Sequence, residues 1–441
     1  MVYGGTAVLA TGFFDPTSKL GLLGRILADA RNSAKSTNLS LPAYATALSS
    51  SAPTQQTDPD AYQIITQALA AGQTKIHLPG GNYSVSQQVN INNTPNVEIF
   101  GDGQNATILR LNDNVYGGSN TNPLPAHVLS FFESDGFHVH DLQIDGNAAA
   151  NPVQEGPFSP YAMNGINTYQ CSNGTVNNCL IHDARYYGIS IEVGSNCIVI
   201  NNTVLNSNSN GIVVSSASTH GSGHQVINNL VNGASEVGIS CWEANGALVQ
   251  GNKVQNITLN NSPTGTNTHV GILAEGRSPC INCTFSNNTV SNISSPSTPP
   301  YQGVGMGAGS NGSSNIQFLN NKFQNVYQMM RLTGGVTGIT VRGNICRSPT
   351  AISDPIVGIS AGTCAPPPCV HYAPTGIDIE QNTIAAIPFG MTAFVVVINA
   401  GSGMFINNTI DMNGNPINKA ITVSPPIKAN WVTSPNTINP N

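Results

Sequence analysis

Short segments that return at a nearly constant interval restrict the fold of this chain more than any other feature of its sequence. The dipeptide Gly-Ile opens five of them, and successive copies lie 23, 23, 27 and 33 residues apart. The five copies begin at Gly165, Gly188, Gly211, Gly238 and Gly271. Self-similarity at a period of about 20–50 residues is typical of repeat proteins, in which each repeat packs only on its neighbours. The sequence therefore predicts a stack of similar rungs.

A second repeated feature is an asparagine at the start of another short segment. The residue before this asparagine is asparagine, glycine or glutamine. The pair recurs at 177–178, 201–202, 228–229, 251–252, 287–288, 320–321, 343–344, 381–382 and 407–408. Identical amides at one corner can bond along a stack of strands that are about 4.8 Å apart. These patterns predict an all-β fold, a right-handed parallel β-helix, with Asn178, Asn202, Asn229 and Asn252 stacked at one corner.

The first residues differ from the repeats. Between Lys19 and Lys35 the apolar residues have helical spacing, and residues 36–57 form a linker rich in Ser, Thr, Ala and Pro. We expect this short helical N-terminal extension, 1–57, to attach the rest of the chain to a sister chain or to a particle.

A second helix is predicted at 58–72. Asp58 suits its N-cap, Pro59 its first turn and Gly72 its end. A helix directly before a stack of strands can cover the open end of the stack, which would otherwise offer unpaired backbone groups. We therefore predict a β-helix over 58–425 with a capping helix at 58–72, followed by a C-terminal tail over 426–441.

Composition narrows the class of protein. Charged residues make up only 8% of the chain, and the net charge is −6, which argues against a nucleic-acid partner. Nine cysteines and thirteen N-x-S/T sequons fit a secreted glycoprotein with disulfides, and the predicted pairs are Cys171–Cys197 and Cys364–Cys369. The chain has no apolar run long enough to predict a membrane span, and the N-terminus lacks the basic region of a signal peptide. We expect an extracellular or virion-surface location.

Two stretches carry a family resemblance. The first is DPDAYQIITQALAAGQTKIHLPGGNYSVSQQVNI with the GDGQNATILRL that follows it, and the second is FHVHDLQIDGN at 137–147. They resemble the pectate-lyase-like (pectin lyase-like) right-handed parallel β-helix superfamily over about residues 58–425. The resemblance implies the fold rather than one function, because the superfamily includes polysaccharide lyases, glycosidases, epimerases, virus tailspike-like proteins and inert adhesins. The Asp-Asp and Gly-His-Gly motifs of polygalacturonases and the Asp-Pro-His-Glu motif of alginate epimerases are missing.

One outward-facing column carries the chemistry that the sequence offers. Side chains alternate along a strand, so the residue four positions after each repeat glycine points away from the core. This column consists of Tyr169, Glu192, Ser215, Trp242 and Glu275. Aromatic rings and carboxylates on one face suit sugars, since rings stack on them and acids transfer protons. The competing interpretation is that these are ordinary solvated positions on a broad sheet.

The candidate site extends beyond the column. The predicted catalytic residues are Glu192, Glu243, Glu275, Asp183 and Arg185, and the predicted substrate-binding residues are Tyr169, Tyr187, Trp242 and Arg277. Glu192 and Glu243 would be the pair of an inverting hydrolase. In a lyase, Arg185 or Tyr187 would be the base and Arg277 would neutralise a substrate carboxylate.

We therefore expect a protein that binds a surface polysaccharide or cell-surface glycan and, if it is an enzyme, cleaves it as a lyase or glycoside hydrolase. The alternative is a non-catalytic structural or receptor-binding virion spike or adhesin. We expect a homo-oligomer, for example a trimer, or attachment to a larger particle. We expect neither a cofactor nor a metal ion. His138 and His140 face one side of a strand beside Asp141, and a metal pair there is the less favoured interpretation. A metal or proton-transfer pair at His220 and His224 is likewise the less favoured interpretation.

Overall fold

A computed structural model describes the fold of the chain. The residues that it describes are 58–119, 122–151, 163–216, 222–258, 269–276, 278–293, 303–309, 312–350, 357–360, 374–385, 387, 395–398, 401–423 and 431–439. The predicted extension 1–57 lies outside them. Among the described helices none is long and apolar enough to cross a membrane.

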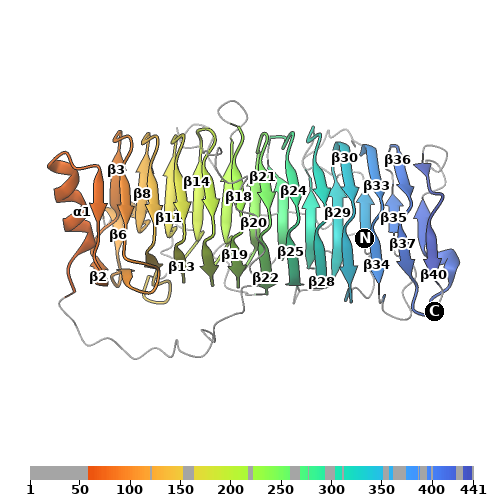
Figure 1. Cartoon of the computed structure of the whole chain (residues 1–441), viewed down its shortest axis with the longest axis horizontal. Helices are drawn as coiled ribbons and strands as arrows, with labels where there is room; N and C mark the ends of the chain where they lie inside the picture. Colours follow the sequence, from red (N-terminus) through yellow and green to blue (C-terminus); the bar gives the residue numbers. More distant parts are fainter. Residues whose placement is uncertain are drawn as a thin grey trace.

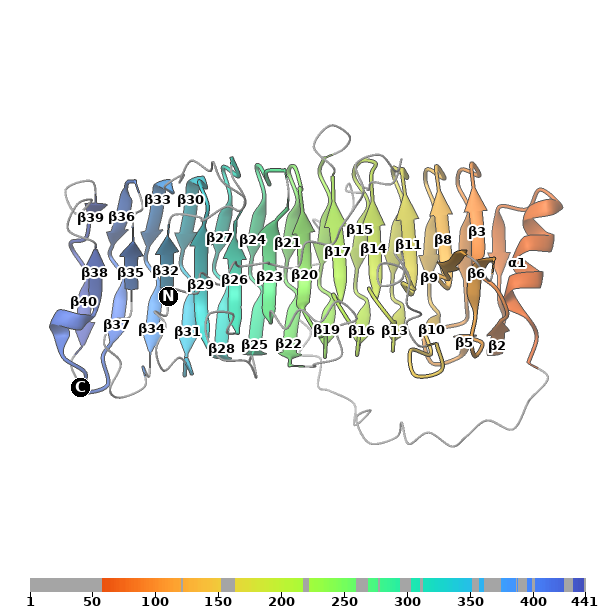
Figure 2. The same ribbon diagram turned by 180° about the vertical axis from the view of Figure 1, so that it is seen from behind.

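Three long parallel sheets run along the molecule, and each rung of the solenoid contributes one strand to each sheet in turn (Figures 1 and 2). We call them sheets I, II and III in the order in which the chain visits them.

Sheet I has 13 strands: β1 (Lys75–His77), β4 (Glu98–Phe100), β9 (His138–His140), β12 (Thr175–Asn177), β15 (Ile198–Ile200), β18 (Gln225–Ile227), β21 (Leu248–Gln250), β24 (Thr284–Ser286), β27 (Gln317–Leu319), β30 (Thr337–Arg342), β33 (Thr375–Glu380), β36 (Gly403–Ile406) and β39 (Trp431–Val432). Sheet II has 13 strands: β2 (Gly81–Val85), β5 (Thr107–Leu111), β10 (Gln143–Asp145), β13 (Leu180–His182), β16 (Thr203–Leu205), β19 (Leu230–Asn232), β22 (Lys253–Ile257), β25 (Thr289–Ile293), β28 (Lys322–Val326), β31 (Ile345–Arg347), β34 (Thr383–Ala385), β37 (Thr409–Asp411) and β40 (Thr437–Asn439).

Sheet III has 12 strands: β3 (Val89–Asn92), β8 (Leu129–Phe132), β11 (Ile166–Tyr169), β14 (Ile189–Glu192), β17 (Ile212–Ser215), β20 (Val237–Trp242), β23 (Val270–Glu275), β26 (Val304–Ala308), β29 (Gln328–Thr333), β32 (Val357–Ser360), β35 (Val395–Ile398) and β38 (Ile421–Val423). A short antiparallel hairpin, β6 (Tyr116–Ser119) with β7 (Asn122–Pro125), lies outside the three sheets, and a single 3-10 turn covers Ile417–Lys419. The predicted parallel β-helix is confirmed.

The repeat glycines are required by close packing at the corner that leads into sheet III. A Cβ atom on Gly188 would lie 2.4 Å from Cγ1 of Val204, and one on Gly211 would lie 2.3 Å from Cγ1 of Val231. Neither glycine has a positive φ, so it is space and not backbone conformation that excludes a side chain. The isoleucine that follows each glycine then points into the core and is fully buried, as at Ile189 and Ile212.

The corner between sheets I and II carries the predicted asparagine ladder. The Nδ2 of Asn202 donates to Oδ1 of Asn229 at 3.0 Å, and Asn229 donates to Asn252 in the same way. Asn178 is not part of the ladder, which corrects the prediction by one residue, because Cys179 occupies that position and donates its backbone N–H to Asn202 at 3.0 Å. The ladder continues through Asn288, Asn321, Asn344, Asn382, Asn408 and Asn436.

The helix α1 (Ala61–Ala70) covers one end of the solenoid (Figure 1). Its N-cap is Asp60, which accepts a bond from the backbone N–H of Tyr62, so the predicted cap at Asp58 is two residues too early. Gly72 ends the helix as predicted, with a φ of +75°. Ala61 and Ile65 are fully buried against the stack, which places apolar side chains over its open end.

The other end of the β-helix extends beyond the predicted boundary at residue 425. Trp431–Val432 and Thr437–Asn439 add the last strands to sheets I and II. These two strands, which lie within the segment predicted as a tail, therefore belong to the final rung.

Buried thiols replace the predicted disulfide. Cys171 and Cys197 are both buried thiols that form no disulfide, so the proposed pair between them is wrong, and the seven cysteines among the described residues are all buried thiols. The pair Cys364–Cys369 lies outside the described residues. Neighbouring rungs bring two positions close together, but a disulfide also requires that the two side chains point toward each other. Here the thiols instead pack in the hydrophobic core.

Candidate functional site

The predicted column forms one continuous line on the outer face of sheet III. Tyr169 pairs in register with Glu192, Glu192 with Ser215, Ser215 with Trp242, and Trp242 with Glu275. The intervening residues Ile189 and Ile191 belong to the core, so the column faces away from it. The sequence therefore predicts the register of this line correctly.

An aromatic residue that the sequence did not single out extends the column. Phe132 on β8 is in register with Tyr169 on β11, and the two rings are stacked with centroids 5.0 Å apart and planes 2° apart. Phe132 and Tyr169 are followed by Glu192 and, two strands later, by Trp242. The line thus carries three aromatic and two carboxylic side chains, with Ser215 between Glu192 and Trp242.

Glu192 is a carboxyl group in a poorly solvated position. Its residue is only 8% exposed, and Ser190 Oγ donates to its Oε1 at 2.6 Å. Burial raises the pKa of Glu192 to about 8, and the bond from Ser190 offsets only part of that effect. Glu192 is therefore mostly protonated at neutral pH and able to give up a proton.

Glu275 is the second carboxyl group with an altered acidity. Burial raises the pKa of Glu275 to about 7, and the positive charge of Arg331 counteracts part of that shift. Its carboxyl carbon lies 3.1 Å from the place that a Cβ on Gly309 would occupy, so a glycine in the next rung leaves it room. The sequence did not predict Arg331, because its strand, β29, lacks the Gly-Ile anchor.

Tyr187 lies at the edge of the same face. Its hydroxyl donates to the hydroxyl of Tyr186 at 3.1 Å, and both rings pack with Val213, which is on β17 between Ile212 and Val214. Because Ile212 and Val214 are core residues, Val213 points outward beside the column. Tyr187 thus lies beside the column.

Asp183 belongs to a different surface from the column. It occupies the corner after β13 with a φ of 51°, and its carboxylate accepts from Nδ1 of His182 at 2.8 Å. Burial acts to raise the pKa of Asp183, but the hydrogen bonds from His182 and Asn206 and the positive charges of His182 and Arg110 together outweigh it, and the pKa lies below its usual range. Asp183 therefore joins the outer face of sheet II, which separates it from Glu192. Arg185 is in the same corner segment, between β13 and β14.

Glu243 is a turn residue and does not extend the column. Directly after Trp242, it adopts a φ of 55°, and its Oε1 accepts from the backbone N–H of Ser278 at 3.0 Å. Its carboxylate therefore holds the corner between β23 and the next strand of sheet I, which does not fit the predicted role as partner of Glu192. Arg277 lies outside the described residues.

Two groups of side chains on the other sheets have ligand atoms close enough to hold a metal ion. They are Glu98, His138 and His140 on sheet I, and Asp145, His182 and Asp183 on sheet II, and in each group the ligand atoms lie within 4.8 Å of one another. In the second group Arg110 pairs with Asp145 at 2.9 Å and His182 pairs with Asp183. In the first group Glu98 pairs with Lys75 and His140 pairs with Asp141, and the group has two imidazoles and one carboxylate.

Comparisons with solved structures find several proteins with a similar fold. The A-module of a mannuronan C-5 epimerase from Azotobacter vinelandii is similar with a TM-score of 0.59 and 18% identity, covering 87% of this chain and 96% of that one. A DFA-IIIase from Arthrobacter chlorophenolicus gives 0.53 and 15%, covering 87% and 96%. The catalytic domain of an alpha-1,3-glucanase gives 0.53 and 14%, covering 87% and 67%. At these identities the likeness shows the fold alone.

No curated protein shows significant similarity to this chain by sequence. The family model described as "Right handed beta helix region" matches residues 71–254 and 164–346, which together span more than half of the chain. Three parallel sheets, one strand of each per rung, and an asparagine ladder at one corner agree with that match. The chain is therefore a member of the right-handed β-helix family.

Proposed function

We propose that this protein binds a polysaccharide along the outer face of sheet III and acts on it by proton transfer. The observation that carries the proposal is the column itself, in which the carboxyl groups of Glu192 and Glu275 have pKa values of about 8 and 7 between aromatic side chains. A proton-transfer group works best when its pKa is close to the operating pH. The aromatic rings of Tyr169 and Trp242 supply surfaces on which sugar rings stack.

The spacing of the two carboxyl groups favours separate roles. Glu192 and Glu275 are three strand steps apart, which corresponds to roughly 14 Å along the axis. The two carboxyl groups of a glycoside hydrolase are at most about 9.5 Å apart. The pair is therefore too widely spaced to act on one glycosidic bond in the hydrolase manner.

A lyase-type reaction agrees better with the surroundings of Glu275. Its pKa of about 7 leaves a substantial fraction ionised at neutral pH, so it can accept the proton from C5 of a sugar acid. The electron pair of that C–H bond then forms the C4=C5 double bond while the C4–O glycosidic bond breaks, and water protonates the leaving oxygen. The guanidinium of Arg331, close enough to affect that pKa, could then bind the carboxylate of a uronic acid and make the neighbouring C–H more acidic. The substrate class that we propose is therefore an acidic polysaccharide.

Two further features of the molecule support a polysaccharide ligand. Proteins with a similar fold include a mannuronan C-5 epimerase and an alpha-1,3-glucanase, whose names denote enzymes that act on carbohydrate polymers. The column also runs parallel to the long axis, so several sugar residues of an extended chain can contact it at once. We propose an extracellular or virion-surface location, and a homo-oligomer or attachment to a particle through residues 1–57.

A non-catalytic spike or adhesin is the second candidate, and the burial of the column favours it. Tyr169 is 5% exposed and Glu192 is 8% exposed, which limits the approach of a substrate to that part of the line. In that case sugar binding would involve the more exposed Trp242.

Activity on a panel of acidic and neutral polysaccharides tests the proposal. We expect products that absorb at 235 nm from a polyuronate, loss of turnover in Glu275→Gln, and reduced turnover in Glu192→Gln. The control is Glu133→Gln, an exposed corner acid, which should keep wild-type activity. Trp242→Ala should weaken binding by about 1–3 kcal/mol, because it removes a large apolar contact.

The outcomes separate the candidates. Binding without any product supports the spike or adhesin. Full activity in both glutamine variants, or no binding to any glycan, contradicts the site.

A further inference from the structure

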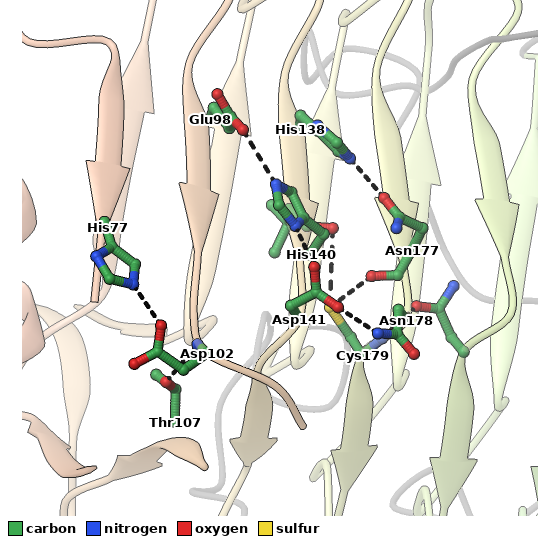
Figure 3. A network of polar contacts seen from close by, with 12 residues as sticks. His77, Glu98, Asp102, Thr107, His138, His140, Asp141, Asn177, Asn178 and Cys179 are labelled. Atoms are coloured by element: carbon green, nitrogen blue, oxygen red, sulfur yellow. Dashed lines mark hydrogen bonds and ion pairs between the residues drawn. The ribbon is translucent and has the colours of Figure 1, made fainter. Parts of the chain in front are cut away.

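The outer face of sheet I carries a group of histidines and acids near the capped end of the solenoid that the polysaccharide site does not use. Figure 3 shows His138 and His140 on β9 with Glu98 on the neighbouring strand β4. Glu98 is directly in register with His138, and His140 lies two residues further along the same strand. All three side chains are partly exposed, so an ion from solvent can reach them.

The distances suit a single ion. One ligand atom from each of Glu98, His138 and His140 lies within 4.8 Å of the others, and the two imidazole rings have centroids 4.1 Å apart. In a tetrahedral zinc site with bonds of about 2.0–2.2 Å to nitrogen and oxygen, ligand atoms are roughly 3.4 Å apart. Small rotations of the side chains therefore suffice to close the set around one ion.

Hydrogen bonds already prepare each imidazole as a ligand. Nε2 of His138 faces Oδ1 of Asn177 at 2.5 Å, and Nδ1 of His140 faces Oδ2 of Asp141 at 2.7 Å (Figure 3). Because those oxygens accept, the facing nitrogens carry the hydrogens, which leaves the lone pair of His138 on Nδ1. The other nitrogen of His140, Nε2, faces Oε1 of Glu98, so a metal ion there would take the place of the proton between them. Orientation of a metal-binding histidine by a second carboxylate or carbonyl is a recurring feature of metal sites.

The carboxylate of Glu98 also forms a weak, solvent-exposed pair with Lys75. Oε1 of Glu98 lies 3.1 Å from Nε2 of His140, while Oε2 accepts from Nζ of Lys75 at 2.7 Å. The Lys75 side chain is 68% exposed, so its pairing with Glu98 is weak and easily exchanged for solvent. An ion at this place would replace the proton between Glu98 and His140 and leave Oε2 with Lys75.

We propose that Glu98, His138 and His140 bind one divalent transition-metal ion of the zinc type. Two imidazole nitrogens and one carboxylate oxygen suit a borderline-soft ion and not calcium or magnesium, which require oxygen ligands. The three ligands leave a fourth position for water or an external group. The ion links β4 to β9, two strands whose ligands are 42 residues apart in the chain, and so fastens the rungs next to α1.

Metal titration of the untagged full chain tests this site. We expect one bound Zn²⁺ per chain by isothermal titration calorimetry and by elemental analysis after dialysis, and a higher thermal midpoint with Zn²⁺ than without. His140→Ala, His138→Ala and Glu98→Gln should each lose the bound ion and the thermal shift. Asp141→Asn should keep the ion but bind it about 10–100-fold more weakly, because it removes only the orienting partner of His140.

Two histidine controls make the test specific. His77→Ala changes a partly exposed histidine of the same face outside the trio, and His182→Gln changes the group on sheet II, so both should bind Zn²⁺ as the wild type does. Circular dichroism confirms that each variant folds. No bound ion in the wild type, or loss of binding in His182→Gln with retention in His140→Ala, overturns the proposal. Neither result depends on the activity of the sheet III face.

Discussion

At the scale of single residues, burial on an outer face gives this chain its altered acidities. Glu192 is the carboxyl group whose acidity should affect folding stability most, since its pKa of about 8 is well above the ordinary value of about 4.5. The folded protein therefore holds a proton that the unfolded chain releases above about pH 5. Stability should then fall as the pH rises from about 5 to 8, because ionisation favours the unfolded chain in that window.

Replacing Glu192 by Gln should remove this dependence. The neutral amide has no proton to lose, so we expect Glu192→Gln to match the wild type near pH 5 and to be more stable near pH 8.5. The difference has an upper limit of about 4–5 kcal/mol, since each pKa unit corresponds to about 1.4 kcal/mol. Thermal or urea unfolding from pH 5 to 8.5 measures it, with Glu133→Gln as the control that keeps the wild-type slope. Equal slopes in all three proteins would show that Glu192 is solvated.

At the scale of elements, the corner between sheets I and II is held by buried amides. Asn288 is a central member of the ladder: its Oδ1 accepts from both the backbone N–H and Nδ2 of Asn252, and its Nδ2 donates to Val249 and Asn321. Asn288 is fully buried, so no water can replace these bonds. The exposed asparagine before it, Asn287, has a φ of 56° and serves the turn alone.

Asn288→Ala should destabilise the protein by about 2–4 kcal/mol, because it leaves buried donors of Asn252 and the carbonyl of Val249 without partners. The control is Asn287→Gly, which tolerates the positive φ and should change stability by less than about 1 kcal/mol. Urea or thermal unfolding of both variants measures the difference. If the two variants were equally stable, the ladder would not be a main support of this corner.

At the scale of the whole molecule, the solenoid has its own cap and is expected to fold without the segment before it. Helix α1 begins at Ala61 and already covers the first rung with Ala61 and Ile65. We therefore propose that the apolar residues upstream of this cap serve attachment to another chain or to a particle.

Deletion of residues 1–57 should leave the β-helix folded and lower the oligomeric state. Circular dichroism and thermal unfolding report on the fold, and light scattering after size-exclusion chromatography reports on the mass. Unfolding of the truncated chain would mean that the segment is part of the core.

Local pattern made much of this fold predictable. The Gly-Ile anchors fix the register of sheet III, since Gly188 and Gly211 are needed wherever the chain passes the valines of sheet II. That register also fixed the line from Tyr169 to Glu275. The ladder was predicted within one residue, and the error at Asn178 arose because a pair of asparagines fits two alignments and Cys179 was not recognised as a ladder position.

The sequence by itself thus determined the rung, its period and the face on which the column lies, because these follow from spacings within one repeat. Only the tertiary structure decided which neighbours join that column. Asp183 and Glu243 leave it because corner residues with positive φ turn toward another surface. Phe132 joins it because stacking brings β8 into register with β11, and Arg331 lies in the neighbouring line of Leu273 and Gly307, beside Glu275. The stack also sets the environment of each side chain, and burial among neighbouring rungs is what raises the pKa values of Glu192 and Glu275.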